Sequence, residues 1–269
     1  MLFYLLSPGD FEAARQYQKR GFTILRSGHV RSQFEEVDSQ AVACLCHEGL
    51  FRWHFGKASI CRAPIGEAIS LAKDLRDAHG LALALFFSAM LGYFERKSSE
   101  VERLASELIE LSTRQCFGHW VALGSAYRGW ACSVSGNPAE GISWIENGIR
   151  DYRAIGSTLF MPLCLVLKAD TLHLADRTSE ALEVINEAEA MAERFEQRYY
   201  CAELHRLRGV FLAATGAEET QIEASFVKAI RTAREQKSVS LEKRAEATYA
   251  EYRRQKASAS GGRGFRLPL

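Results

Sequence analysis

The feature that most constrains this chain is a repeat of 40 residues. Small residues recur at this interval, and they are Gly49, Ala89, Gly129, Ala169 and Gly209. Glycine or alanine at one fixed point of each unit allows two helices to cross closely, because a larger side chain would hold their backbones apart. Self-similarity at a fixed period predicts a stack of equivalent units that share a continuous core.

A second column of residues follows the first by seven positions. It consists of Gly56, Arg96, Gly136, Asp176 and Gly216. Glycine predominates in it, and glycine commonly ends helices or makes turns. Apolar residues with amphipathic-helix spacing lie downstream, as in SEALEVINEAEAM. Further breaks occur near 79–80, 116–118, 156 and 196–197.

These breaks predict that each unit is a pair of helices of roughly 15 to 18 residues joined by short turns. Only five prolines interrupt the chain, so long helices are permitted nearly everywhere. Pro138 and Pro162 suit the first turn of a helix, and Pro64 must either begin its helix or kink it. The sequence therefore predicts an all-α fold, an open right-handed α-solenoid of about five helix pairs with fragments at each end.

Composition excludes several classes of protein. The chain has 34 basic and 33 acidic residues, a formal charge of +1, so we expect no nucleic-acid binding through bulk charge. The longest apolar run, residues 81–94, is shorter than the roughly 20 residues of a membrane span, so we expect no membrane partner. Seven cysteines at no framework spacing indicate reduced core residues of a cytoplasmic protein.

The spacing of small and turn residues is similar to that of the tetratricopeptide repeat. In two units the pattern continues with Gly141 and Ala181, five residues after the turn. The period of 40 exceeds the usual 34 of that family, which implies lengthened helices. The segments HWVALGSAYRGWACSVSGNPAEGISWIENGIRDYRAIG and CAELHRLRGVFL resemble the helical-repeat region of large bacterial regulators, which carry an ATPase module and often an adenylate or guanylate cyclase domain upstream.

The resemblance covers residues from about 9 to about 256 and implies one repeat domain over residues 1–257. Within it, residues 1–27 would form a partial first repeat and residues 28–257 the remaining repeats. Residues 258–269 are expected to be a disordered tail. The enzymatic parts of such regulators are missing, because the sequence contains neither a GxxxxGK[ST] phosphate loop nor a cyclase-type set of metal-binding carboxylates.

No catalytic, cofactor-binding or metal-binding residue is assigned. Cys44, His47 and His54 share one helix face and could begin a zinc site with Cys46 or Cys61. Zinc sites usually draw paired ligands from two elements, so a buried structural role is favoured. A Cys/His nucleophilic pair remains open, because such pairs meet in space and not in sequence.

Three successive units place a cation directly before the small residue. If the first helices of the pairs line a concave face, these cations would form a basic track with a spacing of about 10 Å. Aromatic anchors and further basic residues nearby complete a candidate partner groove. Its residues are Arg128, Lys168, Arg208, Arg206, His205, Trp53, Tyr93 and Trp130. The alternative is an ordinary solvated face.

The sequence thus favours a non-enzymatic, cytoplasmic protein-interaction scaffold. Its expected partner is a protein or peptide segment, acidic if the basic track is the groove, or a cyclase or ATPase domain of a nucleotide-signalling regulator. The alternative is a small-molecule-sensing module that controls an attached or separately encoded cyclase or ATPase. A free-standing enzyme is the third interpretation, since stacking of repeats accounts for nearly every patterned residue.

Overall fold

The structure is a computed structural model, which describes residues 9–26, 37–258, 265 and 267. Within these ranges it consists of twelve α-helices and two short 3-10 turns, without a strand. The α-helices are α2 (Phe11–Arg26), α3 (Val37–His54), α4 (Arg62–Asp74), α5 (Ala78–Phe94), α6 (Ser98–Arg114), α7 (Gly118–Val134), α8 (Pro138–Ala154), α9 (Met161–Leu174), α10 (Thr178–Arg194), α11 (Cys201–Ala214), α12 (Glu219–Glu235) and α13 (Val239–Ser258). The 3-10 turns are η1 (Ala58–Ile60) and η2 (Arg198–Tyr200).

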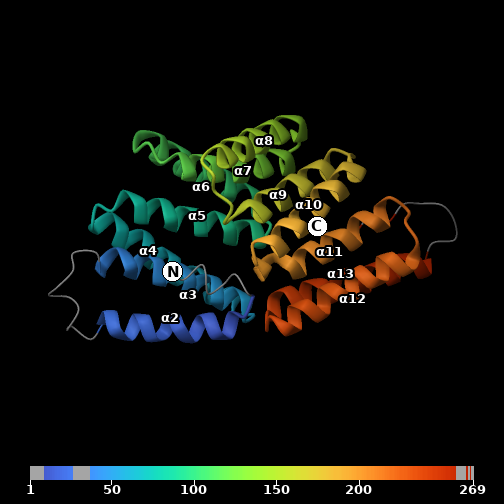
Figure 1. Cartoon of the computed structure of the whole chain (residues 1–269), viewed down its shortest axis with the longest axis horizontal. Coiled ribbons are helices and arrows are strands. Elements are labelled where there is room, and N and C mark those ends of the chain that lie inside the picture. Colours follow the sequence, from blue (N-terminus) through green and yellow to red (C-terminus); the bar gives the residue numbers. More distant parts are fainter. Residues whose placement is uncertain (1–8, 27–36, 259–264, 266, 268–269) are drawn as a thin grey trace.

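The helices form five consecutive pairs, α3/α4 to α11/α12, with α2 before them and α13 after them. Figure 1 shows that the pairs follow an arch, from α2 and α3 through α7 and α8 to α12 and α13. The predicted α-solenoid of about five pairs is confirmed. Pro138 begins α8, and Pro64 and Pro162 lie in the first turns of α4 and α9, where the missing N–H breaks no helical bond. No helix of the described ranges is long and apolar enough to cross a membrane.

The small-residue column marks the point where the two helices of a pair cross. A Cβ atom on Gly129 would lie 2.5 Å from the carbonyl oxygen of Gly141 in α8 and 2.6 Å from Cγ1 of Ile145. A Cβ atom on Gly49 would lie 2.7 Å from the carbonyl oxygen of Cys61. At Gly49 and Gly129 only a residue without Cβ fits at such separations, whereas the crossings at Ala89 and Ala169 accommodate a methyl group, so the column as a whole requires small side chains.

The turn column adopts one backbone conformation throughout. All five of its members have positive φ, from 58° at Arg96 to 102° at Gly136. In the turn after α7 the N–H of Gly136 donates to Ser133 O, and that of Asn137 donates to Cys132 O, both at 3.1 Å. This is the hydrogen-bond pattern of a Schellman helix ending. The turns after the second helices repeat it, with positive φ at Cys116, Gly156 and Glu196, so the chain reverses about every twenty residues.

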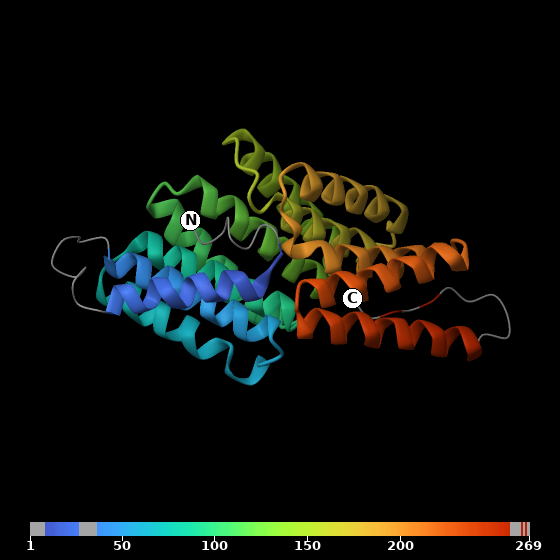
Figure 2. The same ribbon diagram turned by 60° about the horizontal axis from the view of Figure 1, so that its bottom comes forward.

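The two ends of the arch touch, which differs from the open solenoid expected from the sequence. His54 at the end of α3 forms a hydrogen bond of 2.8 Å with Ser238, 184 residues later. The guanidinium of Arg244 in α13 lies 5.4 Å from the ring centroid of Trp53. Phe11 of α2 stacks on His54 with ring centroids 3.7 Å apart. Figure 2 shows α3 and α13 meeting from a second direction. The curvature accumulated over five pairs brings the ends together, and no single repeat encodes it.

The segment expected to be disordered, residues 258–269, is packed at its two described positions beyond α13. The ring of Phe265 lies 4.8 Å from that of Tyr252, and Leu267 is only 8% exposed. Both residues belong to or pack against the main hydrophobic core. The other residues of this segment, and residues 1–8 of the predicted partial repeat, lie outside the described ranges.

Candidate ligand site on the inner face

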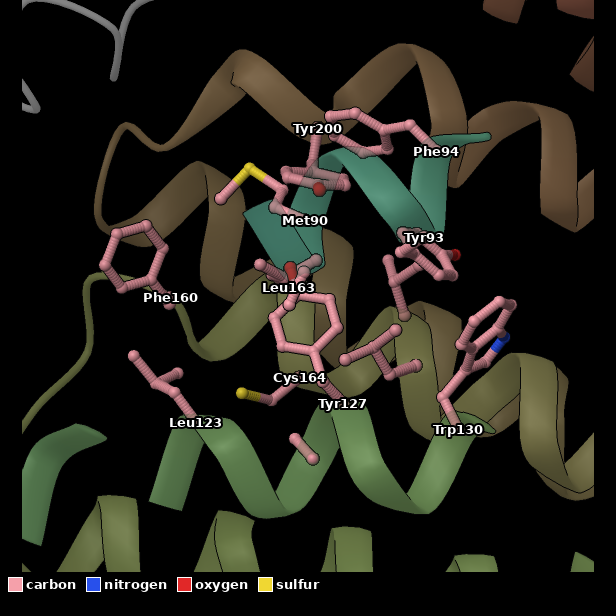
Figure 3. Close-up of a cluster of buried hydrophobic side chains, with 14 of the residues drawn as sticks. Met90, Tyr93, Phe94, Leu123, Tyr127, Trp130, Phe160, Leu163, Cys164 and Tyr200 are labelled. Atoms are coloured by element: carbon pink, nitrogen blue, oxygen red, sulfur yellow. The ribbon is translucent and has the colours of Figure 1, made fainter. Parts of the chain in front are cut away.

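The first helices of the pairs line the inner face of the arch. Contacts join α3 to α5, α5 to α7, α7 to α9, and α11 to α13. Aromatic side chains fill the space between them, and Figure 3 shows this cluster with Tyr93 beside Trp130 and Phe94 beside Tyr200. The ring centroids of these pairs are 5.0 and 5.8 Å apart. The inner face is therefore filled by the chain's own side chains.

One end of this aromatic cluster carries an ion pair between the half-buried Arg96 and the fully buried Asp170. Arg96, in the turn after α5, donates to Oδ2 of Asp170 in α9 at 2.7 Å. The Tyr93 hydroxyl donates to the same oxygen at 2.8 Å, and burial together with the Asp170 charge raises the pKa of Tyr93 well above its usual value. The guanidinium carbon of Arg96 lies 4.7 Å from the ring centroid of Tyr93 and 5.8 Å from that of Trp130. Cation–π interaction with these two rings stabilises the positive charge of Arg96.

A second group of charges lies next to the first. Glu203 of α11 accepts hydrogen bonds from Nε and one terminal nitrogen of Arg206 at 3.0 and 2.8 Å, and from Arg244 of α13 at 3.2 Å. A terminal nitrogen of Arg96 lies 3.8 Å from the same carboxylate. Burial alone would raise the pKa of Glu203, but the charges of Arg206, Arg244 and Arg96 lower it far below its usual value. Glu203 is thus a carboxylate at neutral pH and joins three elements of the arch.

Donors outnumber acceptors in this inner cluster. Three guanidinium groups, Arg96, Arg206 and Arg244, share two carboxylates, Asp170 and Glu203. Among the described residues, the buried donors of this region that lack a hydrogen-bond acceptor include Nε and a terminal nitrogen of Arg96, the indole nitrogen of Trp130 and the hydroxyls of Tyr127 and Tyr200. Oδ1 of Asp170 is the one carboxylate oxygen here without a donor. A buried group with an excess of N–H donors and positive charge favours a ligand that carries oxygen acceptors.

The space beside these groups is small in this conformation. A cavity of about 10 Å³ is lined by residues that include His54, Phe94, Tyr200, Glu203 and Leu241. This volume holds no more than one water molecule. Its lining comes from α3, α5, η2, α11 and α13, so the cavity lies where the two ends of the arch meet.

Four of the eight predicted groove residues lie in or beside this inner cluster. Arg206, Trp53, Tyr93 and Trp130 are buried there, with at most 4% exposure. They are therefore part of the interior in this conformation, and the aromatic residues are not exposed anchors on an open groove. The sequence did not single out Asp170, Glu203 and Arg244 at all. The available signal was a carboxylate within a mostly apolar helix: Asp170 lies in α9 and is fully buried.

The three cations of the basic column point away from the inner face. Each binds a carboxylate on the second helix of the preceding pair. The pairs are Arg128–Glu102 at 3.4 Å, Lys168–Glu146 at 2.9 Å and Arg208–Glu189 at 2.7 Å. The cause is helix geometry: the small residue faces the second helix of its own pair, so the residue before it lies about 100° away around the helix. Each cation is thus compensated by a carboxylate of a neighbouring helix, and the role of the three cations in binding a partner stays a prediction.

The eighth predicted residue, His205, lies at a separate pocket. Its Nδ1 lies 3.0 Å from Glu189, whose other partner is Arg208. Burial would raise the pKa of Glu189, but the hydrogen bonds and charges of His205 and Arg208 lower it to about 2. The pocket has a volume of about 570 Å³ and is lined by residues of α10, η2, α11 and α12, among them Lys228 and Arg231, and by Gly9 and Asp10 before α2. Its size falls within the range of small-molecule sites.

The histidines and cysteines of α3 take structural positions. His47 lies 2.6 Å from the carbonyl oxygen of Ala43, and burial lowers its pKa to about 4. His54 contacts Ser238, and Cys44 and Cys46 are buried with raised pKa values. Among residues 9–26, 37–258, 265 and 267, no three His, Cys, Asp or Glu side chains form a group that could hold a metal ion.

Comparisons with known proteins agree with this architecture. No family model matches the chain. A curated relative, the uncharacterized protein R02095 of Rhizobium meliloti (strain 1021), is 25% identical over 220 residues, which are 82% of this chain and 21% of the relative. The chain therefore spans about a fifth of that relative's length.

Two solved structures share the fold. PlcR of Bacillus thuringiensis, solved in complex with the peptide PapR7 and DNA, has a TM-score of 0.59 at 13% identity, over 86% of this chain and 77% of that chain. RapI in its apo form has a TM-score of 0.58 at 12% identity, over 96% of this chain and 100% of that chain. At these identities the likeness shows the fold, a TPR-like helical solenoid.

Proposed function

We propose that this chain is a non-enzymatic, TPR-like interaction module whose inner face binds a protein or peptide segment through oxygen acceptors. The observation that carries the proposal is Arg96. Its guanidinium is held against Tyr93 and Trp130, and two of its nitrogens have no hydrogen-bond acceptor within the described residues. A carboxylate or carbonyl group of a ligand would supply that acceptor.

Because the two ends of the arch touch, we propose that ligand binding is coupled to their separation. Ligand entry requires α3 and α13 to separate, so binding and the distance between the two ends of the arch are coupled. A ligand shifts such an equilibrium only through its higher affinity for one of the two states. The PlcR structure, which holds a peptide on a similar fold, supports a peptide as the ligand class.

We further propose that the module is the regulatory part of a longer, cytoplasmic bacterial protein with an ATPase or cyclase domain. The length of the Rhizobium relative, in which this region is about a fifth, supports an arrangement with additional domains. The likeness of residues 119–156 and 201–212 to the repeat region of such regulators is the source of the nucleotide-signalling part. The near-neutral charge of +1 supports a protein and not a nucleic acid as partner.

Affinity capture from bacterial extract with the purified chain tests the proposal. The matched variant is Arg96→Lys, which keeps the positive charge but loses the planar set of donors. We expect one stoichiometric protein to be retained by the wild type and largely lost by the variant, with unchanged helicity and a similar Tm. Equal retention of a partner by both proteins would show that the inner face is not the binding site.

Arg128, Lys168 and Arg208 remain proposed contact residues on the outside of the first helices. Exchange of all three for glutamine keeps size and removes charge, and it releases Glu102, Glu146 and Glu189. If an acidic partner uses this surface, the triple variant loses the partner while Arg96→Lys keeps it. The two variants therefore distinguish the two surfaces.

A small-molecule sensor is the second candidate, and the pocket of about 570 Å³ beside Glu189 and His205 favours it. A bound metabolite would stabilise the folded state by mass action and raise the Tm. A thermal-shift screen with His205→Gln as the control variant tests this function. The absence of any His205-dependent shift, together with stoichiometric capture of a protein, would leave the interaction module as the better account.

A further inference from the structure

The pocket of about 570 Å³ beside α11 is bordered by charges of both signs. From α10 it is lined by Glu189 and Glu193, which lie one turn apart on the same face of the helix. From α12 it is lined by Lys228 and by Arg231, whose guanidinium lies 3.8 Å from the carboxylate of Glu235. Helix α11 packs against both α10 and α12. The pocket therefore presents acidic and basic groups from different helices to a molecule inside it.

In the described part of the chain, three charged side chains of this pocket take part in no ion pair, and they are Glu193, Arg198 and Lys228. All three are exposed, so a ligand can reach them from solvent. They lie near one point of the pocket wall, the thiol of Cys201. Burial raises the pKa of Cys201 to about 11, the charges of Glu189 and Glu193 also raise it, and those of Arg198 and Lys228 lower it. Charges of both signs thus act at the same place in the pocket.

A buried amide adds a hydrogen-bond acceptor to the pocket wall. Gln236, directly after α12, lines the pocket and is only 5% exposed. Its Nε2 donates to the carbonyl oxygen of Arg198, but its Oε1 has no donor within the described residues. A buried acceptor without a donor costs free energy. A ligand that carries an N–H group would supply the missing donor.

The wall of this pocket comes from both ends of the arch. Gly9 and Asp10, directly before α2, line it together with Gln236. The backbone of Gly9 lies against this amide, because a Cβ atom on Gly9 would lie 2.7 Å from Nε2 of Gln236. Asp10 is held in place as the N-cap of α2, where its side chain accepts the N–H of Ala13 at 2.9 Å. A molecule that contacts both sides of the pocket binds the closed arch more tightly than the open one and so favours closure.

We propose that this pocket binds a small zwitterion, a free amino acid or a short peptide with free termini, and that this ligand holds the arch closed. Its ammonium group binds Glu193 and Oε1 of Gln236, and its carboxylate binds Lys228 and Arg198. The proposal rests on the second candidate function, the small-molecule sensor, and names the class of its ligand. A ligand of the inner face needs the two ends to separate, so the two ligands oppose each other, and this coupling is reciprocal.

The test uses the purified full chain and the proteinogenic L-amino acids as separate probes, with diglycine as the peptide probe. A probe that binds the folded state raises the Tm by mass action. Isothermal titration calorimetry then compares each such probe with its N-acetyl derivative, which lacks the ammonium group, and with its carboxamide, which lacks the carboxylate. We expect at least one probe to bind and both derivatives to bind at least about 10-fold more weakly, because each loses a charge-assisted hydrogen bond.

Two charge-neutral variants locate the binding site. Lys228→Gln and Glu193→Gln should each weaken the binding of the same probe by about 10-fold or more. The matched controls are Lys243→Gln on α13 and Glu183→Gln on α10, two exposed residues outside the pocket, and they should bind the probe as the wild type does. Absence of binding by every probe, equal binding of the derivatives, or unchanged binding by the two pocket variants would overturn the proposal.

Hydrogen exchange followed by mass spectrometry tests the effect on the arch. The bound probe should slow the exchange of backbone amides in residues 50–54, at the end of α3, although α3 contributes no described residue to the pocket. Unchanged exchange at these amides would contradict the closing effect.

The outcomes separate this proposal from the functions proposed above. A His205-dependent rise in Tm with inorganic phosphate, and with no amino acid or diglycine, would keep the sensor function and overturn the zwitterion as its ligand. Loss of a captured protein in Arg96→Lys would keep the interaction module, irrespective of whether an amino acid binds.

Discussion

Glu203 and Arg206 form an ion pair one helical turn apart on α11, with two hydrogen bonds of 3.0 and 2.8 Å and side-chain exposures of 2% and 1%. Arg244 of α13 donates to the same carboxylate at 3.2 Å. The carboxylate therefore compensates cations from two helices that are distant in sequence. Glu203 thus connects α11 with α13 on the inner face.

Replacement of Glu203 by alanine should destabilise the protein by about 3–5 kcal/mol, because it leaves buried guanidinium groups without a counter-charge. Urea unfolding followed by circular dichroism measures this change. The control is Glu251→Ala, which breaks a pair of the same spacing and geometry with Arg254 on the exposed side of α13. Solvent screens that pair, so its loss should have little effect. Equal destabilisation by both variants would contradict the role assigned to burial.

Stability should decrease as the pH falls, in part because of His54. Burial and the charge of Arg244 lower the pKa of His54 to about 3, whereas the unfolded chain has an ordinary value of about 6.5. Between these values the unfolded state binds a proton that the folded state does not, so the free energy of unfolding falls by up to about 1.4 kcal/mol per pH unit. Unfolding measured between about pH 6 and pH 5 should show this slope, since carboxylates titrate mainly below that range.

The matched variant for this pH dependence is His54→Gln, which cannot gain a proton. The free energy of unfolding of this variant should depend less steeply on pH than that of the wild type, by the slope that corresponds to about one bound proton. His47, with a pKa near 4, still contributes to the slope in both proteins. An identical slope in the wild type and the variant would show that His54 is accessible to protons in the folded state.

The turn positions offer a test of backbone conformation alone. Glu196 has a φ of 54°, a left-handed conformation that glycine adopts more easily, so Glu196→Gly should stabilise the protein by about 0.5–1 kcal/mol. Gly216 has a φ of 71°, and a Cβ atom there would meet nothing within 4 Å. Gly216→Ala should therefore destabilise by about 1–2 kcal/mol through backbone strain alone. We expect the Tm to rise for Glu196→Gly and to fall for Gly216→Ala. Shifts of the same sign would show that the left-handed backbone conformation is not the cause.

Gly129→Ala should destabilise the protein by about 1–3 kcal/mol or more, because its Cβ would lie 2.5 Å from the carbonyl oxygen of Gly141 and force α7 and α8 apart. The control is Gly66→Ala in α4, where a Cβ atom would meet nothing within 4 Å. That change should stabilise by roughly 0.5–1 kcal/mol, because alanine loses less backbone entropy in a helix. Chemical denaturation of both variants measures the difference in their free energies of unfolding. If Gly129→Ala leaves the stability unchanged, the close helix crossing is not the reason for the small-residue column.

The repeat could be predicted because it depends on local backbone requirements. Gly136 and Asp176 occupy turns that need positive φ, and Gly129 occupies a crossing that excludes a Cβ atom. Such requirements recur in each unit and are therefore visible as columns in one sequence. The ion pairs of the basic column had no signature in the sequence: Arg128, Lys168 and Arg208 each meet a carboxylate of the preceding second helix, and their role in partner binding stays a prediction.

The inner cluster could not be predicted in the same way. Arg96 was visible as a turn residue, but its partner Asp170 lies 74 residues later. Glu203 and Arg244 are separated by 41 residues. No local pattern relates these positions, because each ion pair depends on the rotation between successive helix pairs and on the position of α13 relative to the other helices.

The sequence by itself determined the helices, their pairing and their turns, because these depend on residues close together in the chain. The tertiary structure decided that the arch closes between His54 and Ser238 and that the inner face is filled by aromatic and charged side chains. It also decided that the ring of Phe265 packs against Tyr252 of the last helix. These features arise from small rotations that add up over five helix pairs, and a sum of that kind has no signature in any one repeat.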